Sequence, residues 1–333
     1  MVVVIISCVV ALLLFCGYLL FTQQLCRIHH TLPLSQDTSS LPERTIQLAY
    51  WSSWLPWELY DEEVSVTVND MGTNAHQGQV ILHSRRIGKV ECTLQQEVTD
   101  DSVSFRVIAR RFFFGDLNIS IKIESSDNAN YLVLTGENKL PFWRRYHHTQ
   151  QLNQLYADLK LMLVRFHAQL EPETETTLSF KVSCCQQLDN VDAVTRPFIV
   201  SDQPMSQTME LGFQDLTTAL GPDNPPAGPR FAIFETADPS HHHFVGKLGV
   251  PIQCFTPCDA HPERIVLRGA FASLKFQGSY RYLGLAWHVL NMYCYCHNLR
   301  KVRRRPSIEV YEVSPHDTHE ELQFITVLHA PIH

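Results

Sequence analysis

Short segments of alternating apolar and polar residues fill much of the first half of the chain. Gly, Asn and Asp residues, which favour turns, separate these segments. Side chains of a β-strand point alternately to its two faces, so the pattern predicts a curved antiparallel sheet with one solvated face. The predicted strands are residues 64–68, 80–82, 89–94, 103–107, 117–123 and 131–135.

A long amphipathic helix is predicted after this sheet. Its apolar residues recur at spacings of three and four, which places them on one stripe that can lie against the sheet. They are Leu152, Leu155, Leu159, Met162, Phe166 and Leu170. A strand at residues 30–34, a short helix near 41–44 and a Trp-rich segment at 51–57 precede the sheet.

The second half of the chain shows a repeated order of strand, helix and two strands. Residues 171–177 precede it and are acidic, rich in Thr and interrupted by Pro, which is typical of a solvated connector. A duplicated α+β domain is therefore expected. Its first half has elements at 178–183, 205–220 and 231–235, and its second half at 265–275, from 283, at 308–311 and at 324–330.

The helix of the second half has a clear apolar face. Leu283, Trp287, Leu290 and Cys294 are spaced by four, three and four residues. Basic residues at 300–305 suit the negative end of a helix dipole, and Pro306 prevents continuation.

Residues 2–21 carry no charged side chain, and this length is enough for a helix to cross a bilayer. The run predicts a transmembrane anchor in contact with the lipid bilayer, within residues 1–27. A cleaved signal peptide is the alternative, although a basic n-region and a clear cleavage site are lacking. Basic residues beyond the run favour a single-pass membrane protein with its soluble domains in the cytoplasm.

The expected fold class is α+β. It comprises an N-terminal transmembrane helix, a helix-grip antiparallel sheet domain at residues 28–171, a linker at 172–177 and the duplicated α+β domain at 178–333. The length of the chain, 333 residues, is consistent with two domains.

The second domain resembles the GyrI-like effector-binding family. The resemblance rests on a Gly-Ser-Tyr turn at 278–280, an Ile-Glu-Val-Tyr strand at 308–311, and upstream segments at 228–234 and 248–252. It implies a duplicated fold with a cleft between its halves that holds a small molecule. The family's sensors hold lipophilic cations with a carboxylate and aromatic side chains.

The first domain resembles the polyketide-cyclase/START-related (SRPBCC) superfamily. The Trp-Ser-Ser-Trp-Leu-Pro-Trp segment at 51–57 and the Leu-Pro-Phe-Trp-Arg-Arg-Tyr segment at 140–146 match two places in its anchored members. The resemblance implies a helix-grip fold with a cavity.

The net charge of the chain and the motifs that its sequence lacks argue against several classes of function. The formal net charge is −7 and the basic residues are scattered, so no nucleic-acid partner is expected. Catalytic motifs and nucleotide-binding loops are absent from the sequence, and no cofactor is predicted. Cys294 and Cys296 are two apart on a helix and point in different directions, so no metal site is predicted there. Protein partners are unknown.

Glu309 is the central candidate for ligand binding, and Tyr280, Trp287 and Tyr311 are predicted to line the same pocket. Two interpretations stay open for Glu309, which faces either a cavity or solvent. The family resemblance also implies a Glu four residues before the closing Pro, where this chain has Val327. We therefore expect neutral or weakly charged amphipathic ligands to bind at least as well as cations.

Trp54 and Trp57 are further candidates, with core packing as the alternative. Together these features favour a membrane-anchored protein that binds a small apolar or amphipathic ligand without catalysis. An enzyme, either cyclase-like or hydrolytic, and a structural or partner-docking protein are the alternatives.

Overall fold

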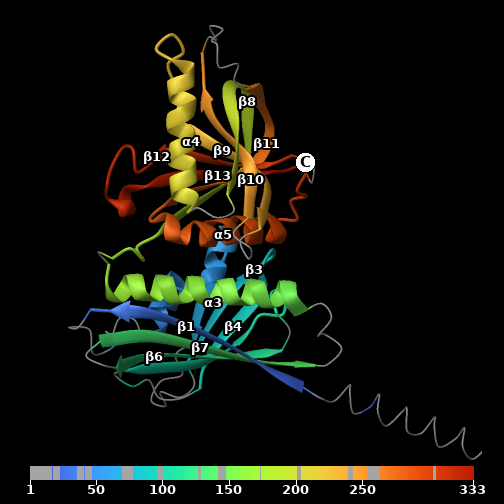
Figure 1. Cartoon of the computed structure of the whole chain (residues 1–333). Coiled ribbons are helices and arrows are strands. Elements are labelled where there is room, and N and C mark those ends of the chain that lie inside the picture. Colours follow the sequence, from blue (N-terminus) through green and yellow to red (C-terminus); the bar gives the residue numbers. More distant parts are fainter. Residues whose placement is uncertain are drawn as a thin grey trace, which may run out of the picture. The chain divides into compact units, whose positions relative to one another are not determined.

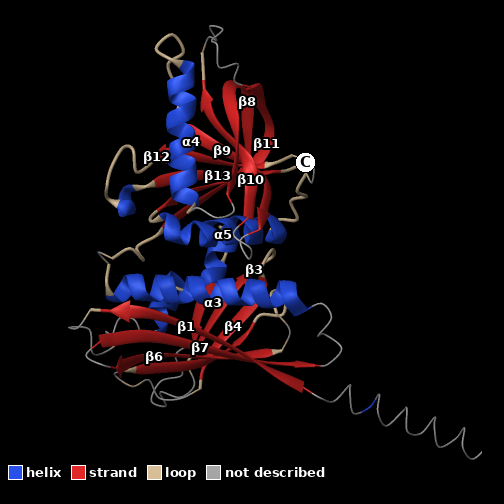
Figure 2. Cartoon of the chain, viewed as in Figure 1, coloured by secondary structure: helices blue, strands red, loops and turns tan. Residues whose placement is uncertain are grey.

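The computed structural model describes most of the chain beyond its N-terminal segment. The described residues are 17, 23–35, 41, 47–69, 78–95, 99, 101–113, 115–126, 129–141, 148–172, 174–200, 204–238, 243–253, 263–302 and 305–333. They divide into two compact units, Met1–Thr176 and Thr177–His333 (unit 1 and unit 2). Each unit is built on one antiparallel sheet with few helices (Figures 1 and 2).

Unit 1 contains a seven-stranded antiparallel sheet in the order β1-β7-β6-β5-β4-β3-β2. Strands two to seven follow one another in the chain as a meander, and β1 pairs with β7 at one edge. The strands are β1 (Gln23–Leu34), β2 (Ser65–Asn69), β3 (Gln79–Ser84), β4 (Gly88–Leu94), β5 (Ser102–Ile108), β6 (Asp116–Ser126) and β7 (Ala129–Pro141).

Helix α3 (His148–Leu170) lies across this sheet (Figure 1). The middle of its apolar stripe is buried, whereas Leu152 and Leu170 at the two ends are half-buried. Two short 3₁₀ helices, η1 (Leu48–Ser53) and η2 (Pro56–Tyr60), complete the core. After α3, Thr176 is buried, and its hydroxyl lies 2.8 Å from Nδ1 of His167. This contact holds the end of unit 1 against its helix.

The prediction of an N-terminal transmembrane helix is wrong, and with it the fold class that began with that helix and the single-pass membrane localisation. Within the described residues, no helix is long and apolar enough to span a bilayer. Residues 2–21, except Gly17, lie outside the described residues. The end of the predicted anchor is β-strand, because β1 begins at Gln23 and pairs with Pro141 of β7.

Unit 2 is a closed barrel of six antiparallel strands in the order β10-β8-β11-β13-β12-β9. Its strands are β8 (Ser179–Val200), β9 (Arg230–Asp238), β10 (His243–Pro251), β11 (Glu263–Gln277), β12 (Ser307–Val313) and β13 (Ile325–Pro331). Its helices are α4 (Met205–Leu220) and α5 (Leu283–Cys296), with short 3₁₀ turns η4 (Tyr280–Tyr282) and η5 (Glu321–Gln323).

The barrel has the same pairing pattern in its two halves. In the first half, β8 pairs with β10, and β10 pairs with β9. In the second half, β11 pairs with β13, and β13 pairs with β12. Two further pairings, β8 with β11 and β9 with β12, close the barrel.

Both helices of unit 2 pack on the outside of the barrel (Figure 1). Alternate side chains of each strand therefore face either a helix or the barrel interior. On the helix side, Phe213 of α4 packs with Phe234 and Tyr311. In the interior, Phe231, Phe271 and Ile308 form a separate apolar cluster. Side chains on the outer face of the barrel wall therefore pack against helix α4, whereas those on the inner face pack against one another.

Candidate functional site

Strand β12 carries the side chains around which the candidate site is built. Glu309 and Tyr311 are two residues apart and therefore point to the same face, the one covered by α4 and α5. Ile308 and Val310 point to the barrel interior. Because side chains alternate between the two faces of β12, Glu309 and Tyr311 can act on the same ligand, and Ile308 and Val310 face away from it.

The carboxylate of Glu309 is buried, with 4% of the residue exposed. Nε1 of Trp287 donates a hydrogen bond to Oε1 at 2.6 Å, and the hydroxyl of Tyr311 donates to Oε2 at 2.7 Å. Burial raises the pKa of Glu309 above its usual range, while the two hydrogen bonds act in the opposite direction. Within the described residues, no basic side chain forms an ion pair with it.

A pocket of about 640 Å³ opens in front of Glu309. This volume is within the range of roughly 300–1,000 Å³ that small-molecule sites occupy. Helix α4, the start of α5, strand β12 and the turn after it contribute its walls. The lining residues are Met205, Ser206, Gln207, Met209, Glu210, Phe213, Arg230, Tyr280, Leu283, Glu309, Tyr311, Ser314, Pro315 and His316.

Aromatic rings form one wall of this pocket. The ring of Tyr311 lies edge-on to Tyr280 and to Phe213, with centroid distances of 5.9 and 6.1 Å. Burial raises the pKa of Tyr280 and of Tyr311 far above the usual value of a phenol, so both hydroxyls stay protonated at neutral pH. The wall offers apolar ring surface and uncharged hydroxyls.

The other charged side chains of the pocket are Arg230 and Glu210. The guanidinium of Arg230 is 3.8 Å from Glu210 and 5.5 Å from the ring centre of Phe213. Among the described lining residues, Glu309 and Glu210 are acidic and Arg230 is basic, which favours a ligand with a positive or hydrogen-bond-donating group.

The turn that closes the pocket is held by Asp317. Its Oδ2 accepts hydrogen bonds from the backbone N–H and the hydroxyl of Ser314, at 2.9 and 2.8 Å. These bonds lower the pKa of Asp317. The side chains at 314–316 are thereby placed as a fixed wall.

The structure brings together four of the six residues predicted from the sequence. Tyr280, Glu309 and Tyr311 line the pocket, whereas Trp287 lies behind Glu309 as its hydrogen-bond donor and does not line it. Of the two interpretations of Glu309, the structure agrees with the cavity-facing one.

Trp54 and Trp57 belong to the core of unit 1. Both are 0% exposed, and their rings pack on Phe166 at 5.2 Å and Phe112 at 6.4 Å. This packing agrees with the core interpretation of the two that the sequence left open. Their predicted role in ligand binding stays a prediction.

The sequence reasoning missed the wall that α4 contributes. Met205, Met209 and Phe213 recur every four residues, so they share one face of the helix. That spacing could have identified them, together with Arg230 at the start of the neighbouring strand.

Val327, at the position where the family resemblance implied a Glu, lines the barrel cavity and does not line the pocket in front of Glu309. Val327 pairs with Val310 across the ladder, and its side chain lines a cavity in the barrel interior. A carboxylate at this position would face away from Glu309.

Metal binding has no support in the described residues, where no group of three or more His, Cys, Asp or Glu side chains could hold an ion. Cys294 and Cys296 are both buried on α5. Cys254 and Cys258, the other pair with metal-like spacing, lie outside the described residues.

Comparisons with known proteins find similarity at the level of structure. No protein-family model matches the chain, and no curated protein matches it. The chain is similar to the crystal structure of the EcmrR C-terminal domain, which has a GyrI-like effector-binding fold, with 13% identity over 46% of this chain and 98% of that one and a TM-score of 0.41.

Two other solved structures are similar to parts of the chain. SAV2435 bound to tetraphenylphosphonium has 14% identity over 46% of this chain and 94% of that one, with a TM-score of 0.32. The Aha1 dimer from Colwellia psychrerythraea has 14% identity over 44% of this chain and 96% of that one, with a TM-score of 0.29. At these scores we draw no functional conclusion from them, and the SRPBCC resemblance of unit 1 stays a prediction.

Proposed function

We propose that unit 2 binds a small apolar or amphipathic molecule, without catalysis, in the pocket in front of Glu309. The observation that carries this proposal is a pocket of about 640 Å³ with aromatic and Met walls and a buried carboxylate at its base. Such a combination of apolar surface and a few directed polar groups is characteristic of ligand sites.

The hydrogen bonds of Glu309 leave it able to bind a ligand. A carboxylate has about four lone-pair sites, and Trp287 and Tyr311 occupy one on each oxygen. A buried carboxylate is costly without a charged partner. A ligand with a positive or donating group would supply that partner and lower the cost.

The rest of the pocket supports an amphipathic ligand. Phe213, Met209 and Tyr280 provide apolar contact, and cations are attracted to aromatic faces. The guanidinium of Arg230 lies 3.8 Å from Glu210, and within the described residues it forms no ion pair with Glu309. The favoured ligand is therefore one with an apolar body and a single cationic or donor group. This replaces the expectation from the sequence that neutral ligands bind at least as well as cations, because that expectation was based on Val327, which lines the barrel cavity.

The test uses the full chain with two probes of similar body: tetraphenylphosphonium, which is a cation, and triphenylphosphine oxide, which is neutral. We expect both to raise the melting temperature of unit 2, the cation more strongly, because only the folded state binds them. Mass spectrometry of the recovered probes should show them unchanged. The absence of any shift with both probes, or chemical turnover of either, would refute the proposal.

A further inference from the structure

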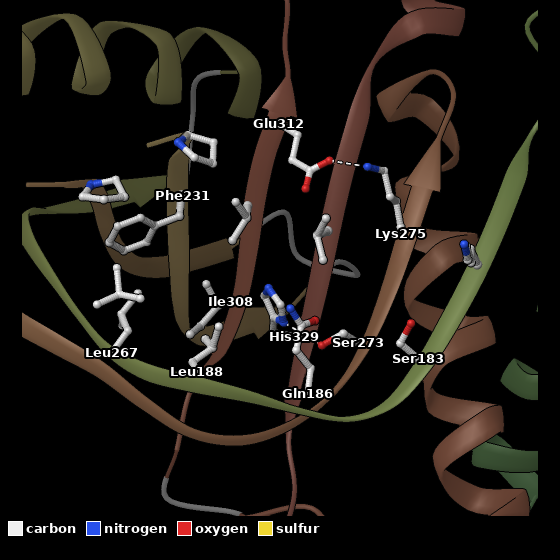
Figure 3. Close-up of a pocket in the computed structure, with 16 residues that line it drawn as sticks. Ser183, Gln186, Leu188, Phe231, Leu267, Ser273, Lys275, Ile308, Glu312 and His329 are labelled. Atoms are coloured by element: carbon white, nitrogen blue, oxygen red, sulfur yellow. Dashed lines mark hydrogen bonds and ion pairs between the residues drawn. The ribbon is translucent and has the colours of Figure 1, made fainter. Parts of the chain in front are cut away.

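The barrel of unit 2 contains a second cavity on the opposite side of its wall from Glu309. Its volume is about 450 Å³, and side chains from all six strands of the barrel line it (Figure 3). Because strand residues alternate, Val310 and Glu312 face this cavity while Glu309 and Tyr311 face the first pocket. The two cavities share a wall, and none of the described residues lines both of them.

One end of the cavity is apolar. Part of the barrel interior is filled by the cluster around Phe231, Phe271 and Ile308, and the unfilled part continues from it. In Figure 3, Leu188, Leu267 and Phe231 lie on the side opposite Lys275. This end offers space and surface for an apolar chain of moderate length.

The centre of the cavity carries an uncharged polar pair. The hydroxyl of Ser273 lies 2.7 Å from Nδ1 of His329, and both residues are buried. Burial lowers the pKa of His329 to about 4, so the imidazole is neutral at neutral pH. The centre therefore adds no charge to the cavity.

Two lysines face each other at the polar end. Lys181 of β8 and Lys275 of β11 are direct partners across the antiparallel ladder, and both line the cavity. Like charges directly opposite each other destabilise a sheet. Glu312 is 2.6 Å from the ammonium of Lys275, and Lys181 forms no ion pair within the described residues. One positive charge is left over at this end.

We propose that the barrel cavity is a second ligand site, and that it binds a small amphipathic anion. The carboxylate of the ligand lies between Lys181 and Lys275, and its apolar chain extends towards Leu188 and Leu267. A carboxylate there relieves the repulsion between the lysines and balances the remaining charge. The site differs in sign from the Glu309 pocket and is independent of the function proposed for that pocket.

Octanoate is the probe for this site, with octanol and octylammonium as matched probes of the same chain length. Isothermal titration of the full chain should show one saturable site for octanoate and at least roughly tenfold weaker binding of the other two. Equal binding of octanol would overturn the anionic part of the proposal, and failure of octanoate to bind would overturn the whole.

Substitutions of single lysines test whether octanoate binds in the barrel cavity. Lys181 is exposed, so Lys181→Gln should fold, and we expect it to weaken octanoate binding roughly fivefold to tenfold, with recovery in Lys181→Arg. Lys89→Gln removes one exposed positive charge from unit 1 and should leave octanoate binding unchanged. Unchanged octanoate binding by Lys181→Gln would place the anion elsewhere and refute the proposal.

A competition experiment separates the two sites. Saturating tetraphenylphosphonium should leave octanoate binding unaffected, because the described residues that line one cavity do not line the other. Displacement of octanoate by tetraphenylphosphonium would refute a second site. If tetraphenylphosphonium does not bind at all, the function proposed for the Glu309 pocket fails, and the effect of Lys181→Gln on octanoate still decides this one.

Discussion

The buried imidazole of His329 makes a quantitative prediction about the pH dependence of stability. Burial lowers its pKa from the usual 6.5 to about 4, and Glu312 opposes this shift only in part. Between these two values the unfolded chain binds a proton that the folded chain does not. The contribution of this residue to stability is therefore complete above about pH 6.5 and is lost as the pH falls towards 4.

The magnitude follows from the two pKa values. Their difference corresponds to about 3 kcal/mol in total, of which about 2 kcal/mol is lost by about pH 5. This is a large share of the stability of an ordinary domain, roughly 5–15 kcal/mol. Other groups also titrate in this range, so the quantity to measure is the difference between the wild type and His329→Gln.

The assay is urea unfolding of the full chain at about pH 8, 6.5 and 5, with hydrogen exchange of β13 peptides as a readout specific to unit 2. We expect the stability advantage of the wild type over His329→Gln to shrink by about 2 kcal/mol between pH 8 and 5. Ser273→Ala keeps the buried imidazole and should keep the pH dependence of the wild type. Parallel loss of stability in the wild type and His329→Gln would show that the buried imidazole does not cause the pH dependence.

Three further predictions concern the fold. Trp287→Phe removes the indole N–H that donates a hydrogen bond to Glu309, and it should lower the free energy of unfolding in urea by about 1–3 kcal/mol. An unchanged urea midpoint would contradict a stabilising role of this hydrogen bond. Gly246→Ala would place a Cβ 1.9 Å from the carbonyl oxygen of Ile233, and we expect the free energy of unfolding to fall by at least about 1–3 kcal/mol. In the control Gly284→Ala, the new Cβ has no heavy atom within 4 Å, so this change should be neutral or stabilising. Residues 23–176 and 177–333, expressed separately, should each melt cooperatively, and a non-cooperative melt of either would contradict independent folding of the two units.

Local periodicity was enough to predict the main elements of unit 2. The spacing of Leu283, Trp287 and Leu290 indicated a helix, and α5 spans Leu283–Cys296. Alternation likewise indicated a strand at residues 308–311, which lies within β12. Both patterns depend only on neighbours in the sequence.

The geometry of the site depends on pairings that local patterns do not contain. That Val327 faces the barrel interior follows from its register with Val310, and that Trp287 donates to Glu309 follows from the packing of α5 on the barrel. Family resemblance did not separate Tyr280, Glu309 and Tyr311, which line the pocket, from Trp287, which lies behind Glu309.

The N-terminal prediction was wrong because it was based only on features of the N-terminal segment itself, namely its uncharged run and the lack of a basic n-region and a clear cleavage site. Hydropathy measures the transfer of a segment into lipid and takes no account of distant partners. The predicted anchor extended to residue 27, yet Gln23–Leu34 pair with Ala129–Pro141 as strands of one sheet. The partner strand is more than 100 residues away in the sequence.

The most direct test of the central claim, that unit 2 binds an amphipathic ligand in front of Glu309, is isothermal titration of tetraphenylphosphonium into the full chain and matched variants. Ser206→Trp fills the pocket from an exposed position on α4, and Leu211→Trp adds the same side chain at an exposed position of α4 that does not line the pocket. Glu309→Gln removes the carboxylate, and Glu235→Gln removes an exposed one from β9.

We expect one binding site in the wild type and an affinity that is at least roughly tenfold weaker in Ser206→Trp and Glu309→Gln, with both controls like the wild type. Binding that is equal in all five proteins, or absent from the wild type, would contradict a ligand site in front of Glu309.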